Sequence, residues 1–245
     1  MNKFILVLLL IPILLLTKTV KSQEVKVFFY YAPFYTPGTG VYVETYLSFS
    51  GPSMYYRLNK DNVYQAVAEV TMLFKNANEV VEFRNFKVSS LGLPDTSSLL
   101  PDFINQNRIV IPEGIYNFEM VVKDINAPDS VKPFVHSELV SVDIASDEIA
   151  FSGIKLVEIY EATNKQNIFV KNGFECIPYV SEVFPPQANY LRFYAELYNA
   201  AKTLGPLNEC LIQIDIENIN TGKPIKEFSS SQKQKAQNIN VVYKE

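Results

Sequence analysis

The sequence predicts an all-β protein, and three observations support this. Short segments rich in Val, Ile, Tyr, Phe and Thr alternate apolar and polar residues from Gln23 onward. Pro, Gly, Asn and Asp interrupt these segments at the spacing of about 8 to 12 residues that is typical of sandwiches. No long segment has a helical period that outweighs the alternation. The mature length suits two domains of about 100 to 120 residues each or one large sandwich, and we expect two domains.

The first 22 residues predict a signal peptide. Lys3 precedes an apolar run from Phe4 to Leu16, and a polar stretch ends at Ser22. As a helix this run covers about 20 Å, less than the roughly 30 Å of a bilayer core. We therefore expect cleavage near Ser22, a mature chain that begins at Gln23, and a secreted or periplasmic location.

Residues 23–146 are expected to form the first domain. Its strands are predicted at 25–30, 41–49, 54–58, 64–75, 80–88, 107–111 and 116–123, and residues 32–40 are read as a Pro- and Gly-containing connection. In the segment 41–49, alternation places Val41, Val43, Thr45, Leu47 and Phe49 on one face, which we expect to point inward. Tyr42, Glu44, Tyr46 and Ser48 then face solvent.

A local motif indicates which kind of sandwich this is. Residues 113–118, Glu-Gly-Ile-Tyr-Asn-Phe, resemble the tyrosine corner of immunoglobulin-type domains, in which the Tyr hydroxyl bonds to upstream backbone. The alternative is that Tyr116 is an ordinary half-buried strand residue. With the strand pattern, the motif predicts two tandem immunoglobulin-like β-sandwich domains after the signal peptide.

Residues 147–245 are expected to form the second domain. Strands are predicted at 149–160, 168–170, 174–183, 190–198, 210–216 and 239–243. Residues 189–201 have enough apolar content for a helix, but strict alternation favours a strand. The polar segment 229–235 is expected to be flexible. The domain ends either with a terminal strand or with part of a truncated neighbour.

Three segments carry a resemblance to known proteins. Residues 31–34 (Tyr-Ala-Pro-Phe), 42–49 and 193–199 are similar to those of uncharacterised exported β-rich proteins of Bacteroidetes-type bacteria. The similarity runs from about Val25 to Glu217 and resembles the region that precedes a GWxTD-type domain. The chain has no Trp, so it lacks that motif itself. The resemblance implies a secreted or envelope location and tandem sandwiches, and it supplies no catalytic residues.

Charge and hydropathy exclude several partners. The 22 basic residues include Lys3, Lys18 and Lys21 of the leader, so the mature chain has 19 basic against 26 acidic residues. A mildly acidic chain is unsuited to nucleic acid, which requires a basic surface. No later segment has the 18 or so consecutive apolar residues of a membrane span.

Residues that carry chemistry are few, so the sequence predicts neither an enzyme nor a cofactor or metal site. His136 is the only histidine, and no Gly-x-Ser-x-Gly motif accompanies it. One His and two Cys lack zinc-ligand spacing. The strand carboxylates Glu44, Glu69, Glu119 and Glu196 are assigned to solvated faces, and no pair stands out as in a glycosidase.

Two further groups of residues have alternative interpretations. Cys176 and Cys210, the only cysteines, would form a disulfide in an oxidising compartment or pack as two buried thiols. Tyr31, Phe34 and Tyr35 would form an interaction loop, or the loop would fold back and plug one end of the sandwich.

We therefore expect an exported non-catalytic protein with a structural or protein-interaction role at the bacterial cell envelope. Its partner would be an unknown envelope protein. The alternative is a glycan-binding module or an accessory protein of carbohydrate processing.

Overall fold

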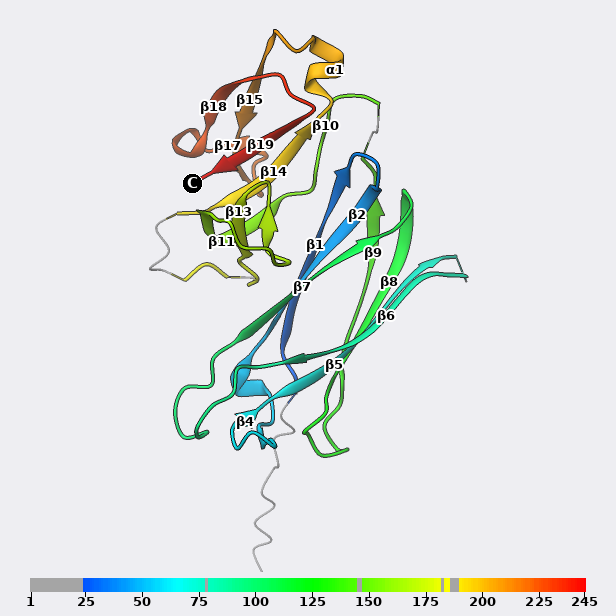
Figure 1. Ribbon diagram of the computed structural model, residues 1–245, viewed down its shortest axis with the longest axis vertical. Helices are drawn as coiled ribbons and strands as arrows, with labels where there is room; N and C mark the ends of the chain where they lie inside the picture. Colours follow the sequence, from blue (N-terminus) through cyan, green and yellow to red (C-terminus); the bar gives the residue numbers. More distant parts are fainter. Residues whose placement is uncertain (1–23, 78, 145–146, 182, 186–189) are drawn as a thin grey trace, which may run out of the picture.

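The protein is all-β, as predicted, and the part of the chain that the structure describes contains one short helix, α1 (Ala200–Leu204), and two 3₁₀ turns, η1 (Gly51–Ser53) and η2 (Lys226–Phe228) (Figure 1). The computed structural model describes residues 24–77, 79–144, 147–181, 183–185 and 190–245. The predicted signal peptide and its cleavage site lie outside the described residues. Within them, no helix is long and apolar enough to cross a membrane.

The N-terminal half, residues 24–144, consists of antiparallel sheets. A three-stranded sheet has the order β1-β2-β7 and a four-stranded sheet the order β6-β5-β8-β9, and β3 and β4 form a small hairpin. The bounds are β1 (Val27–Thr36), β2 (Gly40–Phe49), β3 (Arg57–Leu58), β4 (Tyr64–Gln65), β5 (Val67–Asn76), β6 (Glu79–Ser89), β7 (Phe103–Val110), β8 (Gly114–Asp124) and β9 (Phe134–Val142).

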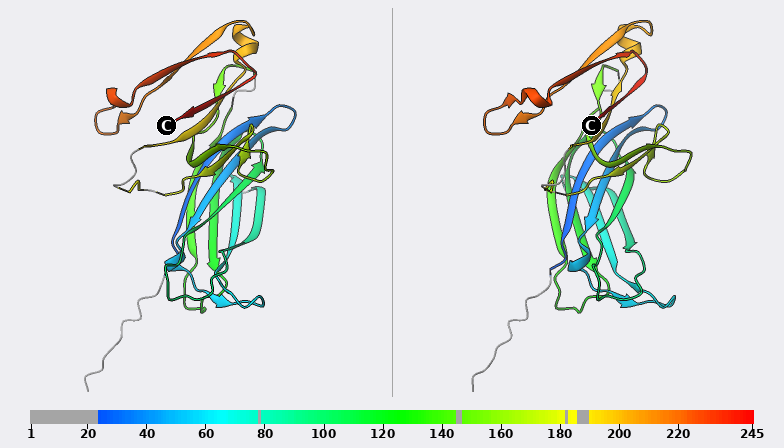
Figure 2. Two further views of the ribbon diagram at one scale, coloured as in Figure 1. Left: turned by 60° about the vertical axis from the view of Figure 1, so that its left-hand side comes forward. Right: turned by 90° about the vertical axis from the view of Figure 1, so that its left-hand side faces the viewer.

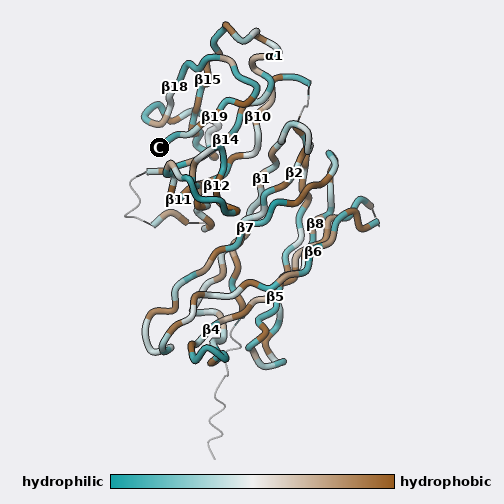
Figure 3. The backbone as a smooth tube through the Cα atoms, in the orientation of Figure 1, coloured by the Kyte–Doolittle hydropathy of each residue, from teal (hydrophilic) through white to brown (hydrophobic). Residues whose placement is uncertain are grey.

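These two sheets enclose an apolar core. Val43 and Leu47 of β2 point inward as predicted, and they share one buried cluster with Met72 of β5 and Phe118 of β8. Phe29 of β1 stacks on Phe118, with ring centroids 4.9 Å apart. Alternation along the strands therefore fills the space between the sheets, and Figure 3 shows apolar residues recurring along them.

The tyrosine corner is present in its defining contact. The Tyr116 hydroxyl donates a hydrogen bond to the carbonyl oxygen of Pro112 over 2.7 Å. Tyr116 is buried in the same core and packs edge-on against Phe74. The hydrogen bond ties the start of β8 to the turn before it.

The prediction that residues 32–40 form a connecting loop is wrong. β1 continues through Thr36, and the turn is confined to residues 37–39, followed by Gly40 at a φ of +96°. Pro33 is tolerated because β1 is an edge strand that pairs only with β2, so no second neighbour needs its missing N–H. Its carbonyl accepts a 2.7 Å hydrogen bond from Gly153 N in the C-terminal half.

The C-terminal half, residues 147–245, contains a six-stranded sheet around β14. β10 and β11 pair with the two ends of β14, β19 pairs with β14 along its whole length, and β13 and β12 follow β11 in that order. Two separate hairpins, β15-β18 and β16-β17, complete it. The bounds are β10 (Ala150–Phe151), β11 (Lys155–Ala162), β12 (Val170–Lys171), β13 (Phe174–Pro178), β14 (Phe193–Tyr198), β15 (Glu209–Ile214), β16 (Glu217–Asn218), β17 (Lys223–Pro224), β18 (Ser230–Lys235) and β19 (Ile239–Lys244).

The strand expected within 189–201 is confirmed as β14, whereas the flexible tail expected at 229–235 is wrong. Residues Ser230–Lys235 form β18, which pairs with β15 along its whole length. The segment is hydrophilic (Figure 3), so backbone hydrogen bonds rather than apolar burial specify this strand. The Gln234 side chain adds a 2.9 Å hydrogen bond to the Val241 carbonyl of β19.

Both faces of β2 are buried, so the prediction that its second face is solvated is wrong. Tyr42 and Tyr46 lie in an apolar cluster with Val157 and Tyr194 of the C-terminal half. Tyr35 N donates to the Tyr198 hydroxyl over 3.0 Å. The upper ends of β1 and β2 therefore lie against the C-terminal half (Figures 1 and 2).

Because β2 belongs to both cores, we expect the two halves to unfold in one cooperative transition. Leu47→Ala should lower the free energy of unfolding by about 2–5 kcal/mol through lost burial and a cavity. The chain has no Trp, so a Trp at the exposed Phe83 or Phe228 would report on one half each. Urea melts of the two reporters should coincide and shift together with Leu47→Ala. Two separate melts, with only the Phe83 reporter shifted, would contradict the shared core.

Candidate functional site

A short motif occurs once in each half and brings the halves together. Residues 42–46 read Tyr-Val-Glu-Thr-Tyr in β2, and residues 194–198 read Tyr-Ala-Glu-Leu-Tyr in β14. In a strand, every second side chain lies on one face, so each Glu is flanked by two phenol rings. Both carboxylates, Glu44 and Glu196, are buried.

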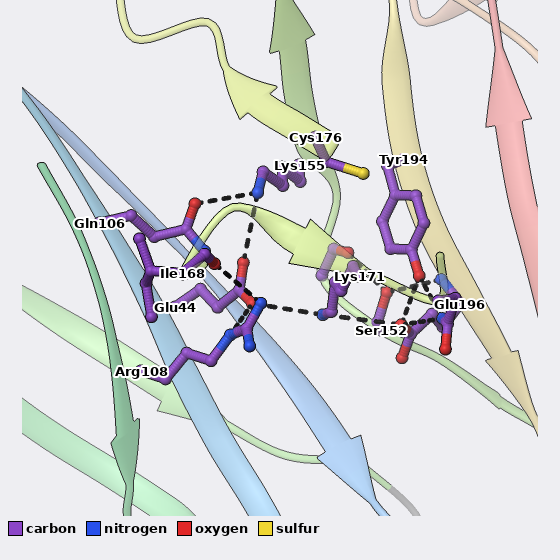
Figure 4. Close-up of polar contacts among 12 residues, drawn as sticks. Glu44, Gln106, Arg108, Ser152, Lys155, Ile168, Lys171, Cys176, Tyr194 and Glu196 are labelled. Carbon is purple, nitrogen blue, oxygen red and sulfur yellow. Dashed lines mark hydrogen bonds and ion pairs between the residues drawn. The ribbon is translucent and has the colours of Figure 1, made fainter. Parts of the chain in front are cut away.

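Glu44 lies beside three cations (Figure 4) and accepts a hydrogen bond from one tyrosine hydroxyl. Arg108 of β7 donates from Nε over 2.9 Å, and the Tyr46 hydroxyl donates over 2.6 Å. Lys155 Nζ and Lys171 Nζ, both from the C-terminal half, lie 3.7 and 3.5 Å away. Burial alone raises the pKa of Glu44, but the three cations and the hydroxyl bring that pKa below its ordinary 4.5. Glu44 is therefore held as a carboxylate.

Glu196 is held mainly by hydrogen bonds. The hydroxyls of Tyr194 and Tyr198 donate to it over 2.5 and 2.6 Å, and the Asn172 amide donates over 3.0 Å. Lys171 Nζ lies 3.6 Å from the same carboxylate. Its partners all come from the C-terminal half.

Lys171 joins the two carboxylates, and we call the set of Glu44, Lys171 and Glu196 the buried bridge (Figure 4). Its Nζ also lies 2.9 Å from the ring centroid of Phe34. Burial lowers the pKa of Lys171 from 10.5 to about 8 although two carboxylates favour its charge. The ammonium is thus surrounded by negative groups and aromatic faces but withdrawn from water.

A tight hairpin positions Lys171. Asn172 and Gly173 connect β12 to β13 and both have positive φ values, 48° and 82°. An Asn-Gly pair with positive φ at both residues is typical of a two-residue type I′ hairpin turn. The turn places Lys171 at the last position of β12 and points Asn172 at Glu196.

Side chains of β7 fasten the hairpin to the N-terminal half. Gln106 accepts a 3.0 Å hydrogen bond from Lys155 Nζ and donates one of equal length to the Ile168 carbonyl. Arg108 donates to the carbonyls of Ile168 and Val170 over 2.9 and 3.0 Å. The charges at the bridge are therefore fixed from both halves.

The bridge contradicts the assignment of Glu44 and Glu196 to solvated faces. Alternation identifies which residues share a face, but not whether another sheet covers it. The repeated Tyr-x-Glu-x-Tyr motif is the signal that could have found them, since two rings beside a carboxylate favour a buried face. All three bridge residues are at most 7% exposed. The arrangement joins the halves, and a substrate cannot reach it while they are in contact.

The predicted interaction loop is not a loop. Tyr31, Phe34 and Tyr35 all lie in β1. Phe34 is fully buried beside Lys171, Tyr35 packs edge-on against Tyr198, and the Tyr31 hydroxyl accepts a 3.3 Å hydrogen bond from Ser141 N. The three rings hold parts of the molecule together.

The predicted disulfide is also absent, because Cys176 and Cys210 are free thiols in different apolar clusters. Cys176 is buried between the halves, and burial raises the pKa of its thiol to about 11. Cys210 contributes to the cluster beneath β15. The alternative of two buried thiols holds for Cys176, whereas Cys210 is half-buried.

The remaining residues considered for chemistry occupy structural positions. His136 lies in β9 among Phe29, Phe118 and Phe134, with Nε2 3.4 Å from Glu138. Within the described residues, no group of His, Cys, Asp or Glu could hold a metal ion.

An apolar groove opens in the C-terminal half between the β14-β19 face and the β15-β18 hairpin. One part, of about 670 Å³, reaches Phe184, Tyr190 and Phe228. The other part, of about 470 Å³, reaches Phe151, Ile154 and Leu156. Both parts share Leu191, Phe193, Ile214 and Ile216, so we treat them as one groove, the lateral groove.

Comparisons with known proteins found no matching family model, no matching curated protein and no matching solved structure.

Glu44→Gln should destabilise the protein strongly, because it removes the charge that balances Lys155, Lys171 and Arg108. Removal of one partner from a buried ion pair typically costs about 3–5 kcal/mol. Glu69→Gln is the matched control, since Glu69 is partly exposed on β5, and it should cost less than about 0.5 kcal/mol. Urea unfolding of both variants measures the difference, and equal losses would show that the bridge is not a stabilising contact.

The pH dependence of stability should carry two signatures of the bridge. Lys171 has a lower pKa in the folded state than in the unfolded state, so the folded state binds fewer protons and the free energy of unfolding should rise from about pH 8 to about pH 10.5. Glu44 has a lowered folded pKa, so its contribution is lost as the pH falls below about 4.5. Urea melts should show Lys171→Met without the alkaline rise and Glu44→Gln with a weaker acid loss. An unchanged profile in either variant would contradict these assignments.

Proposed function

We propose that this chain is an exported protein-interaction module of the bacterial cell envelope, built from two tandem immunoglobulin-like β-sandwich domains, residues 23–146 and 147–245. The apolar leader that ends at Ser22 supports export. The resemblance to exported Bacteroidetes-type proteins supports the envelope location. The Tyr116 corner and the packed sheets support the domain type.

The lateral groove is the observation that carries the interaction role. Phe151 is 52% exposed and Ile154 is 59% exposed, and both line the groove beside half-buried Leu156. Contiguous apolar side chains in an open groove are typical of a protein-binding site. The buried bridge is closed to partners, so the two features have separate roles.

The glycan-binding alternative loses the residues on which it depends. Phe34 is fully buried and Tyr35 packs against Tyr198, so these rings are not available as a stacking platform. The part of the lateral groove around Phe151, Ile154 and Leu156 has a mostly apolar lining, and this favours a polypeptide there over a sugar, whose hydroxyls require polar partners.

Site-specific cross-linking in the native cells tests the proposed function. A photo-reactive residue at Ile154 should cross-link one defined protein in the exported fraction. Leu207 is the matched control, since it is 88% exposed and lies outside the groove lining. If both positions cross-link the same proteins, or if Ile154 gives no cross-link, the proposal is overturned.

A further inference from the structure

The strand β15 has one backbone edge that no strand of the described residues covers. It pairs with β18 alone. Ala236 N donates to the Asn208 carbonyl over 2.9 Å. Because backbone direction alternates along a strand, the N–H and C=O groups of Cys210, Ile212 and Ile214 also point at β18. Those of Glu209, Leu211 and Gln213 therefore point to the open side. An unpaired edge of this kind is a template for another strand.

The sheet beneath β15 extends past this open edge. Phe151, Ile154 and Leu156 line the groove together with Ile212 and Gln213 of β15, whereas no residue of β18 lines this part. The uncovered apolar residues thus lie on the side of β15 that faces away from β18. Adjacent strands are about 4.8 Å apart and packed sheets about 10 Å apart. One more strand beside β15 would lie over these three side chains.

We propose that an extended segment of a partner protein adds to the open edge of β15 and covers the lateral groove. This inference rests on the proposed function and specifies how the groove binds. Hydrogen bonds to Leu211 and Gln213 would provide the backbone ladder, and apolar side chains at every second position would contact Phe151, Ile154 and Leu156. Proline is excluded at every position of the segment whose backbone N–H would have to bond to β15, because proline has no N–H.

The charges at the groove indicate what flanks the segment. Asp215 and Glu227 line it with the cation Lys244, and a third carboxylate in the lining, Glu245, is paired with Arg192 over 3.0 Å, which leaves a small acidic excess. A segment with Lys or Arg at its ends would complement this acidic rim. The occupant is therefore an alternating apolar strand with basic flanks.

A synthetic peptide provides the probe for this mode. The peptide Lys-Val-Thr-Val-Thr-Val-Lys has alternating apolar residues and basic ends, and a scrambled peptide of equal composition is its control. We expect saturable binding of the alternating peptide to the full mature chain by fluorescence anisotropy, at least tenfold tighter than that of the scramble. Amide hydrogen exchange at Leu211 and Gln213 should slow at least tenfold on binding.

Two variants locate the contact. Gln213→Pro removes an edge N–H and Ile154→Asp charges the groove floor, so each should weaken binding at least tenfold. Leu207→Asp should leave binding unchanged. If Gln213→Pro does not fold, alternately N-methylated peptides test the same hydrogen bonds on the unaltered protein and should also bind at least tenfold more weakly.

The possible outcomes separate this inference from the proposed function. Binding that is lost with Ile154→Asp but unaffected by Gln213→Pro and N-methylation would mean that the groove binds without adding a strand, which overturns the inference alone. No binding of the alternating peptide, or equal binding of the scramble, also overturns it, while cross-links from Ile154 still decide the proposed function. A dimer by analytical ultracentrifugation that blocks the peptide would identify a second copy as the occupant and overturn the partner assignment.

Discussion

The contact of Lys171 with Glu44 and Glu196 is the interaction on which the arrangement of the molecule depends. It unites a carboxylate of the N-terminal half with one of the C-terminal half through a single ammonium. The withdrawal of three charges from water is costly, and only their mutual attraction and the surrounding hydrogen bonds offset the cost. Any other packing of the halves that kept these charges buried but apart would lose that compensation, so the bridge favours one relative placement.

The strand β14 connects this joint with the lateral groove. Tyr194, Glu196 and Tyr198 face the N-terminal half, and Ala195 and Leu197 on the opposite face pack beneath the β15-β18 hairpin. One strand therefore has a polar, aromatic face that fixes the halves and an apolar face that leads into the groove. The division of roles follows from the period of two in side-chain direction.

Period-two alternation identified β2 and β14 and placed Leu47 in the core. It failed for Glu44, because the covering residue Lys171 is remote in the sequence and reaches the site through the Asn172-Gly173 turn. It also failed for β18, where polar side chains hide a strand that backbone pairing with β15 specifies. The lateral groove was not predictable from the sequence, since it depends on how far the sheet that contains β10, β11 and β14 extends past the β15-β18 hairpin.

The burial of β2 between the two halves also limits the order in which the parts of the molecule can fold. Tyr35 and Tyr198, which bond across the halves, are 163 residues apart in sequence. Because the chain is synthesised from its N-terminus, the residues of β1 and β2 are available before those of the C-terminal sheet that covers them. Until the C-terminal sheet covers them, Phe34, Tyr42, Tyr46 and Glu44, which are buried in the complete fold, are exposed to solvent. Such an exposed aromatic surface is prone to aggregation at this stage. The charge of Glu44 on the uncovered face of β2 would oppose association with other chains, as a gatekeeper residue does.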